Sequence, residues 1–204
     1  MINLLFGVQW YLWALLLVVT VLAIFVWIKA MAASRIRREK LKKEAEIWKK
    51  DYELRQEFKT LTLEKLNSTD TQKILSGVCM NIQIELENAT DMNEAFLLLP
   101  DEKKYVYCLE YFDEDATKSL STFFKNNGAP LTTYIKPALN AVGYNEIISL
   151  IDIVAPMFDE ESDVSVNHAE VDKADDKFKE LYSSYTLYEA VAKYVKSKKD
   201  IFVE

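Results

Sequence analysis

Glycine and proline are scarce in this sequence: four of each occur in 204 residues. These two residues are the strongest breakers of regular structure. Their scarcity, with apolar residues recurring every three or four positions, therefore predicts an all-α protein. Histidine occurs once and cysteine twice, so we expect no cluster of ligands for zinc or another transition metal. Phosphate-binding loops and the common hydrolase and metalloprotease motifs are also absent. We therefore predict neither catalysis nor a cofactor.

Charge is absent from the 25 residues between Leu4 and Ile28. A helix rises about 1.5 Å per residue, so this run is long enough to cross a hydrocarbon core of ~30 Å. Tryptophan and tyrosine lie near both ends, as in the aromatic belts of membrane spans: Trp10, Tyr11, Trp13 and Trp27. The sequence predicts a single N-terminal transmembrane helix in residues 1–30, acting as a plain anchor.

Two other kinds of segment could contain such a run, a cleaved signal peptide and a buried core helix. A cleaved signal peptide needs a basic start and a shorter apolar stretch, and the residues before Leu4 carry no charged side chain. A buried core helix that is apolar on every face needs an unusually large core.

A basic segment follows the apolar run at once. Eight Lys or Arg and three Glu lie between Arg35 and Lys50. By the positive-inside rule the N-terminus is outside and the rest of the chain is cytoplasmic. We expect residues 31–66 to form a basic juxtamembrane helix. Its candidate contacts with anionic lipid are Arg35, Arg37, Arg38, Lys40, Lys42 and Lys43.

An apolar stripe with spacings of 4, 3 and 4 runs along this segment: Leu41, Ala45, Trp48 and Tyr52. Two interpretations stay open. Residues 41–52 could form a short coiled-coil seam in a weak homo-oligomer, or the stripe could lie against the chain's own domain.

Residues 67–204 have the length of one compact multi-helix domain. Asp70 and Asp91 precede helical patterns as N-caps, and Pro100 begins another helix. Further helices are expected at about 131–142, 145–158, 171–181 and 187–195. The longest buried stripe, predicted as one helix, comprises Tyr105, Leu109, Phe112, Ala116, Leu120 and Phe123. Gly128 is expected to end that helix in a left-handed C-cap.

The domain is strongly acidic. Residues 51–204 hold 16 Lys and Arg against 29 Asp and Glu, a net charge of −13, which argues against direct binding of DNA or RNA. Acids along helices could instead steer a basic partner protein, although they could also serve only solubility. The candidate partner-binding residues are Asp159, Glu160, Glu161, Asp163, Glu170, Asp172, Asp175 and Asp176.

Several other groups are interpreted as structural. Cys79 and Cys108, on the cytoplasmic side, are expected to be buried thiols and not a disulfide. His168 lies in a polar stretch and is expected to be exposed. The carboxylates at Glu110 and Asp113 to Asp115 are interpreted as a solvated helix face.

The stretch from Asp91 to about Val203 contains further motifs. It reads Asn93-Glu94-Ala95-Phe96, Leu99-Pro100, Tyr105-Val106-Tyr107-Cys108-Leu109, Phe123-Phe124-Lys125-Asn126 and Ala138-Leu139-Asn140-Ala141-Val142-Gly143. These residues resemble a bacterial family of small, acidic, all-helical proteins, typified by a DNA mimic that occupies the DNA-binding surface of a transcription factor. The V-N-N-G-G-F motif of that family is replaced here by Asp115-Ala116-Thr117-Lys118-Ser119-Leu120, which are compatible with a helix. The resemblance implies an all-helical fold and a DNA-mimicking surface.

Together these features predict a membrane-anchored, non-catalytic protein-interaction module in the inner membrane of a bacterium. The alternative is a structural or assembly subunit of an envelope complex, in which the first 66 residues bind the partners.

Overall fold

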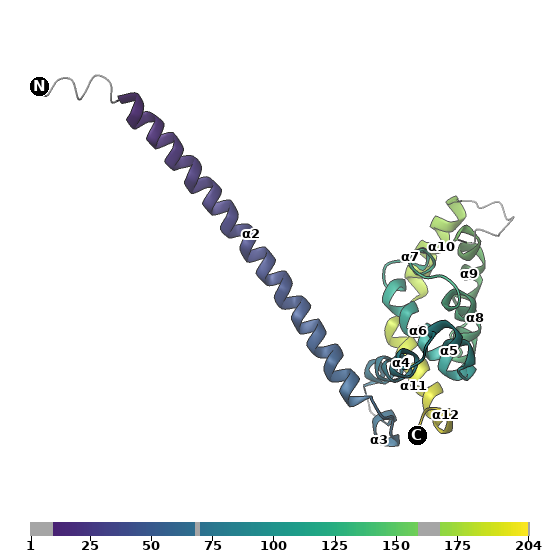
Figure 1. Cartoon of the computed structure of the whole chain (residues 1–204). Helices are drawn as coiled ribbons and strands as arrows, with labels where there is room; N and C mark the ends of the chain where they lie inside the picture. Colours follow the sequence, from purple (N-terminus) through teal and green to yellow (C-terminus); the bar gives the residue numbers. More distant parts are fainter. Residues whose placement is uncertain (1–9, 68–69, 159–167, 204) are drawn as a thin grey trace, which may run out of the picture. The chain divides into compact units, whose positions relative to one another are not determined.

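The computed structural model describes residues 10–67, 70–158 and 168–203, and all the regular structure in these ranges is helical (Figure 1). The predicted all-α class is confirmed. The chain divides into two compact units, Met1–Tyr52 and Glu53–Glu204.

The described part of the first unit belongs to one continuous helix, α2 (Trp10–Glu57). Its large apolar side chains from Leu12 to Ile28 are between 50% and 67% exposed. Within their own unit these side chains are uncovered, whereas the core helix of a soluble protein is mostly buried.

The α2 helix ends at Glu57, so the juxtamembrane helix predicted to extend to residue 66 is too long. The helical spacing of apolar residues continues through Phe58 and Leu61, and both side chains are 1% exposed. The backbone nevertheless leaves the helix there and forms a separate short helix, α3 (Leu63–Leu66). The second compact unit accordingly begins within the last turns of α2, at Glu53.

Side chains that cap both helices explain this break. Lys65 donates hydrogen bonds from its ammonium group to the backbone carbonyls of Glu57 and Thr60, the latter at 2.6 Å. The first bond satisfies a carbonyl at the end of α2, where the helix leaves its last carbonyls without helical partners, and the second ties down the turn that follows. Thr62 is the N-cap of α3, and its hydroxyl accepts the N–H of Lys65.

The second unit contains most of the predicted helices. Asp70 and Asp91 cap α4 and α5 by accepting backbone N–H groups, as predicted, and α6 begins directly after Pro100. After α3, the helices of the described residues are α4 (Thr71–Glu87), α5 (Met92–Leu98), α6 (Asp101–Ala116), α7 (Leu120–Asn126), α8 (Leu131–Ala141), α9 (Ile148–Val154), the 3-10 helix η1 (Ala155–Phe158), α10 (His168–Leu181), α11 (Ser184–Ser197) and α12 (Lys199–Phe202).

Helix α6 lies at the centre of this unit, packed against α4, α7 and α8 (Figure 1). Helix α11 packs on α4, and α9 lies beside α10. At the centre, the ring of Phe112 is fully buried and makes edge-to-face contacts with Phe123, Phe178 and Tyr182 at centroid distances of 5.2, 6.0 and 5.7 Å. Four aromatic rings from three segments of the chain therefore meet at one point.

The stripe predicted as one helix from Tyr105 to Phe123 is divided between α6 and α7. Its members from Leu109 to Phe123 are buried, as predicted, but the helix stops at Ala116. In a continuous helix Phe112 and Phe123 would be about 16 Å apart along the axis. The break is what allows α7 to fold back and bring these two rings into contact.

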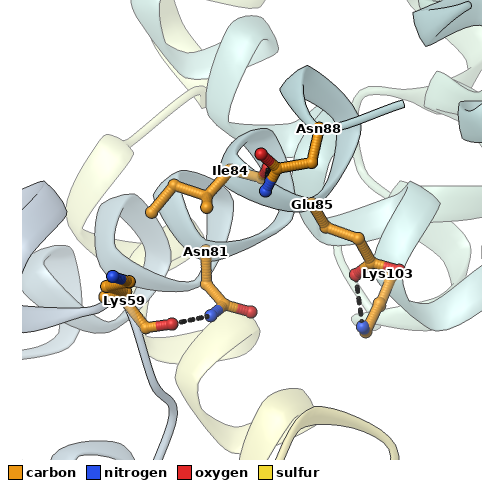
Figure 2. A pocket seen from close by; sticks show the side chains of 6 residues that line it. All are labelled: Lys59, Asn81, Ile84, Glu85, Asn88 and Lys103. Carbon is orange, nitrogen blue, oxygen red and sulfur yellow. Dashed lines mark hydrogen bonds and ion pairs between the residues drawn. The ribbon is translucent and has the colours of Figure 1, made fainter. Parts of the chain in front are cut away.

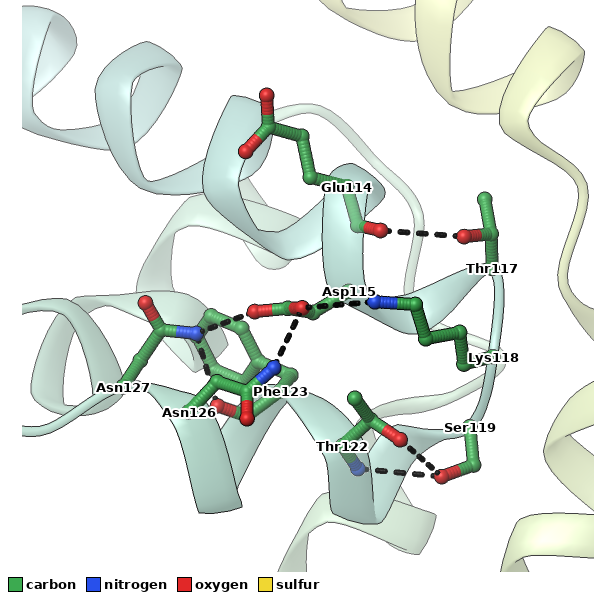
Figure 3. A network of polar contacts seen from close by, with 9 residues as sticks. All are labelled: Glu114, Asp115, Thr117, Lys118, Ser119, Thr122, Phe123, Asn126 and Asn127. Atoms are coloured by element: carbon green, nitrogen blue, oxygen red, sulfur yellow. Dashed lines mark hydrogen bonds and ion pairs between the residues drawn. The ribbon is translucent and has the colours of Figure 1, made fainter. Parts of the chain in front are cut away.

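Polar side chains hold this turn (Figure 3). Ser119 caps α7, its hydroxyl accepting the N–H of Thr122 at 3.1 Å. The Asp115 carboxylate accepts hydrogen bonds from the side-chain amides of Asn126 and Asn127, at 2.7 and 2.9 Å, and lies 3.7 Å from the ammonium of Lys118. Residues 115–120, which we interpreted as compatible with a helix, therefore include a turn that is held by hydrogen bonds and an ion pair.

Three smaller predictions are corrected. Gly128 does not adopt the left-handed conformation that we predicted for it. Gly143, just after α8, does so instead, with φ +76°. The helix expected over residues 145–158 begins at Ile148 and tightens into η1, which contains Pro156. Helix α12 was not predicted, and its Phe202 is buried.

Candidate functional site

The six basic residues predicted to face the membrane surface lie on α2 and are exposed. Successive residues of a helix are rotated by about 100°, so Arg35 to Lys43 place basic side chains around the whole circumference. A helix that lies flat on a membrane needs one apolar and one polar face. A belt of charge is instead typical of the end of a span that crosses the membrane and meets the headgroups.

The apolar stripe on the same helix is exposed. Leu41, Trp48 and Tyr52 are 54%, 76% and 63% exposed, and Ala45 is exposed as well. Both interpretations of the stripe, a seam between copies and a contact with the chain's own domain, therefore stay predictions.

Four of the eight candidate acidic residues lie outside the described residues: Asp159, Glu160, Glu161 and Asp163. The other four lie on α10. Glu170 and Asp172 are exposed and available to a partner.

The last two acidic candidates have partners within the domain, although Asp176 is itself exposed. The carboxylate of Asp175 accepts the backbone N–H of Ser121 at 2.9 Å, in the first turn of α7. Asp176 forms an ion pair with Lys179 at 3.1 Å. Asp175 therefore stabilises the start of α7, a role that residue type and spacing alone did not indicate.

The carboxylate of Asp113 is the least expected feature of the domain. It was interpreted as part of a solvated face, but its residue is only 8% exposed. One carboxylate oxygen accepts the hydroxyl of Tyr182, and the other accepts the hydroxyl of Tyr188 at 2.6 Å. The interpretation was wrong because α6 is covered on this side by the junction between α10 and α11, more than 60 residues further along the chain.

Glu110, one turn before Asp113, is partly buried on α6, which packs against α4. Burial raises the pKa of Glu110 to about 7, and the nearby carboxylates Glu114 and Asp113 act in the same direction. A hydrogen bond with Ser76 of α4 opposes the shift. Burial and the bonds to Asp113 likewise raise the pKa of Tyr182 and of Tyr188, so both hydroxyls stay protonated and act as donors. This cluster joins α4, α6 and α11 and is a structural element of the interior.

A surface cleft of ≈ 300 Å³ is lined mainly by polar side chains from α4 and its neighbours (Figure 2). The amide of Asn81 donates to the carbonyls of Phe58 and Lys59, at 3.1 and 3.2 Å. Across the cleft, Glu85 and Lys103 form an ion pair at 2.7 Å. Most of these polar groups therefore serve the fold, and the lining offers no nucleophile beside a base.

Cys79 and Cys108 are free and buried, as predicted. Burial raises the pKa of both thiols, so neither is a reactive thiolate at neutral pH. His168 is exposed at the start of α10. Among residues 10–67, 70–158 and 168–203, no three His, Cys, Asp or Glu side chains gather to hold a metal ion.

By length and composition, α2 is apolar and long enough to cross a membrane, a test that a signal sequence also passes. No protein-family model matches the chain, and no curated protein or solved structure is significantly similar to it. The resemblance to the DNA-mimic family therefore stays an expectation carried by the residues quoted for it.

Proposed function

We propose that the chain is a single-pass membrane protein without catalytic activity, whose acidic helical domain faces the cytoplasm and binds a basic partner protein. The main support for this proposal is the composition of α2. The first half of this helix has exposed apolar side chains, and a belt of basic side chains follows it at once. Exposed apolar surface on this scale is costly in water and favourable in lipid.

The charges of the two parts support the same arrangement. Residues 31–50 carry a net charge of +5 and residues 51–204 a net charge of −13. The basic part suits an anionic leaflet, and the acidic part is repelled by it. An acidic surface held near a membrane steers basic proteins towards it.

Anchoring and orientation are tested on the full chain. The protein should resist extraction by alkaline carbonate, and a reporter that is active only in the cytoplasm should be active when fused after Glu204. The N-terminal sequence of the isolated protein separates an anchor from a signal sequence. Cleavage before Ser34, or digestion of the C-terminus by protease added to intact cells, would overturn this part of the proposal.

Partner binding is tested with two exposed acidic residues of α10. Replacing Glu170 and Asp172 by Gln and Asn should weaken capture of the partner and reduce the dependence of the association rate on salt. The resemblance to the DNA-mimic family suggests a DNA-binding protein as partner, and in that case double-stranded DNA should compete. Capture that is unchanged in amount and salt resistance would limit these residues to solubility.

The alternative function is a structural or assembly subunit of a membrane complex. The exposed stripe from Leu41 to Tyr52 favours it, because an apolar stripe on a charged helix suits a helical partner. Under this alternative the acidic variant keeps its partners, whereas replacement of Leu41 and Trp48 by Ala loses them.

A further inference from the structure

The stripe on α2 lies in a segment that is otherwise mostly charged. Leu41, Ala45, Trp48 and Tyr52 fall within about 60° of the helix circumference, and the other sides carry mainly charged residues, with Ile36 and Ile47 among them. Spacings of 4, 3 and 4 are those of the core positions of a coiled coil. Within their own unit, Met1–Tyr52, these side chains are exposed.

The charges beside the stripe select the occupant and its direction. Glu44 and Asp51 flank one side of the seam, and Lys42 and Lys49 flank the other. In a parallel, in-register pair of these helices, Glu44 of one copy faces Lys49 of the other, five residues further on. In an antiparallel pair the acidic flanks face each other and the basic flanks do the same.

One pair in the parallel arrangement is unfavourable. Arg37 of one copy would face Lys42 of the other, at the end of the seam nearest the apolar segment. Anionic headgroups at that end reduce the repulsion between basic side chains. The attractive pair lies in the middle of the seam, between Ala45 and Trp48.

We propose that the chain forms a parallel homodimer through α2, with Leu41, Ala45, Trp48 and Tyr52 as its seam. This inference rests in part on the proposed membrane anchoring. Two heptads of coiled coil are marginal alone. A shared membrane holds both copies in the same direction and raises their effective concentration.

Cysteine cross-linking in membranes that contain the full-length protein tests the seam. Ala45→Cys places a thiol at the centre of the stripe, and Ile47→Cys places one on the opposite side of the same exposed helix. Mild oxidation should yield a disulfide-linked dimer with the first variant and little with the second. The native chain is the background control, because Cys79 and Cys108 are buried. Equal cross-linking at the two positions, or none at position 45, overturns the proposal.

The charges provide a second test that leaves the apolar seam intact. Lys49→Glu places like charges opposite each other at two symmetric sites and should weaken the dimer roughly three- to tenfold. The double variant Glu44→Lys, Lys49→Glu restores opposite charges and should restore the dimer. Failure of the double variant to recover dimer beyond Lys49→Glu contradicts the parallel register.

The experiments distinguish an incorrect dimer proposal from an incorrect proposal of membrane anchoring. Carbonate extraction of the same membranes reports anchoring whether or not the copies are cross-linked. Anchored protein without selective cross-linking at position 45 overturns the dimer and leaves the proposed function standing. Extractable protein with selective cross-linking supports the dimer and overturns the anchor.

Discussion

The ring of Phe58 lies where any residue larger than glycine at position 77 would place its side chain. A Cβ atom added to Gly77 would be 2.3 Å from Cε1 of Phe58, far inside van der Waals contact. Phe58 is 1% exposed, so its ring is enclosed. This close approach joins the segment after α2 to the middle of α4, and the absence of a side chain at position 77 is what permits it.

Gly77→Ala should therefore destabilise the domain, although alanine is the better helix former. Overpacking of this kind costs about 1–3 kcal/mol, more than the gain in helix propensity. Urea unfolding of residues 53–204, followed by circular dichroism, measures the loss. Gly128→Ala is the matched control, because no atom lies within 4 Å of its added Cβ. If the two variants are equally stable, the approach of Phe58 to α4 is looser than described.

The buried carboxylate of Asp113 should be a large single contribution to stability. Asp113→Ala removes the acceptor of two tyrosine hydroxyls in the interior, and we expect a loss of about 2–4 kcal/mol. Tyr188→Phe removes one donor and should cost about 1 kcal/mol. Tyr185→Phe, at an exposed site on the same helix, should leave stability nearly unchanged. A double-mutant cycle between Asp113 and Tyr188 that shows no coupling energy would contradict the contact.

The raised pKa of Glu110 makes stability depend on pH in an unusual direction. Its pKa rises from 4.5 to about 7 on folding, so between these values the folded state keeps a proton that the unfolded state releases. Stability should therefore fall as pH rises through this window, by up to about 2–3 kcal/mol once pH 8 is reached. Glu110→Gln removes the penalty, so the variant should be more stable than the native chain at pH 8 and the advantage should vanish near pH 5.

Denaturant titrations at intervals from pH 5 to pH 8 check this dependence. Glu94→Gln, at an exposed site on α5, controls for a change in net charge. Parallel stability curves for the native chain and Glu110→Gln would mean that Glu110 is well hydrated in the folded state.

Local chemistry made much of this fold predictable, and long-range contacts made the rest unpredictable. Asp70 and Asp91 cap helices through residues three positions away, so their roles can be inferred from short patterns. The contact between Asp113 and Tyr188 joins residues 75 positions apart and has no local pattern. Ser119 interrupts a spacing of apolar residues that suits one helix and caps α7, and only the packing of α7 against α6 reveals the turn.

The candidate interaction residues also divide into those whose environment the local sequence predicted and those whose environment depends on long-range contacts. Exposure of the basic belt on α2 agrees with its composition. Capping of α7 by Asp175 depends on α10 lying beside α7, which the acidic composition did not indicate.

Phe112→Ala tests the packing of the core directly. The ring is fully buried among three other rings, so its loss should cost about 3–5 kcal/mol. Leu97→Ala, at a 55% exposed site on α5, is a control for the removal of apolar surface. A loss below about 1 kcal/mol, measured by urea unfolding of residues 53–204, would mean that the site collapses around the smaller side chain.

The acidic residues of α10 allow binding to be separated from folding within one helix. Asp172→Asn and Asp175→Asn remove the same charge only one turn apart, but Asp172 is exposed and Asp175 accepts the N–H of Ser121. If the exposed face binds a basic partner, Asp172→Asn should slow association at low salt and leave the midpoint of urea unfolding unchanged. Asp175→Asn should lower that midpoint, because an amide is a weaker acceptor than a carboxylate at the start of a helix. Binding that is insensitive to Asp172→Asn at low salt would remove this face of α10 from the interaction surface.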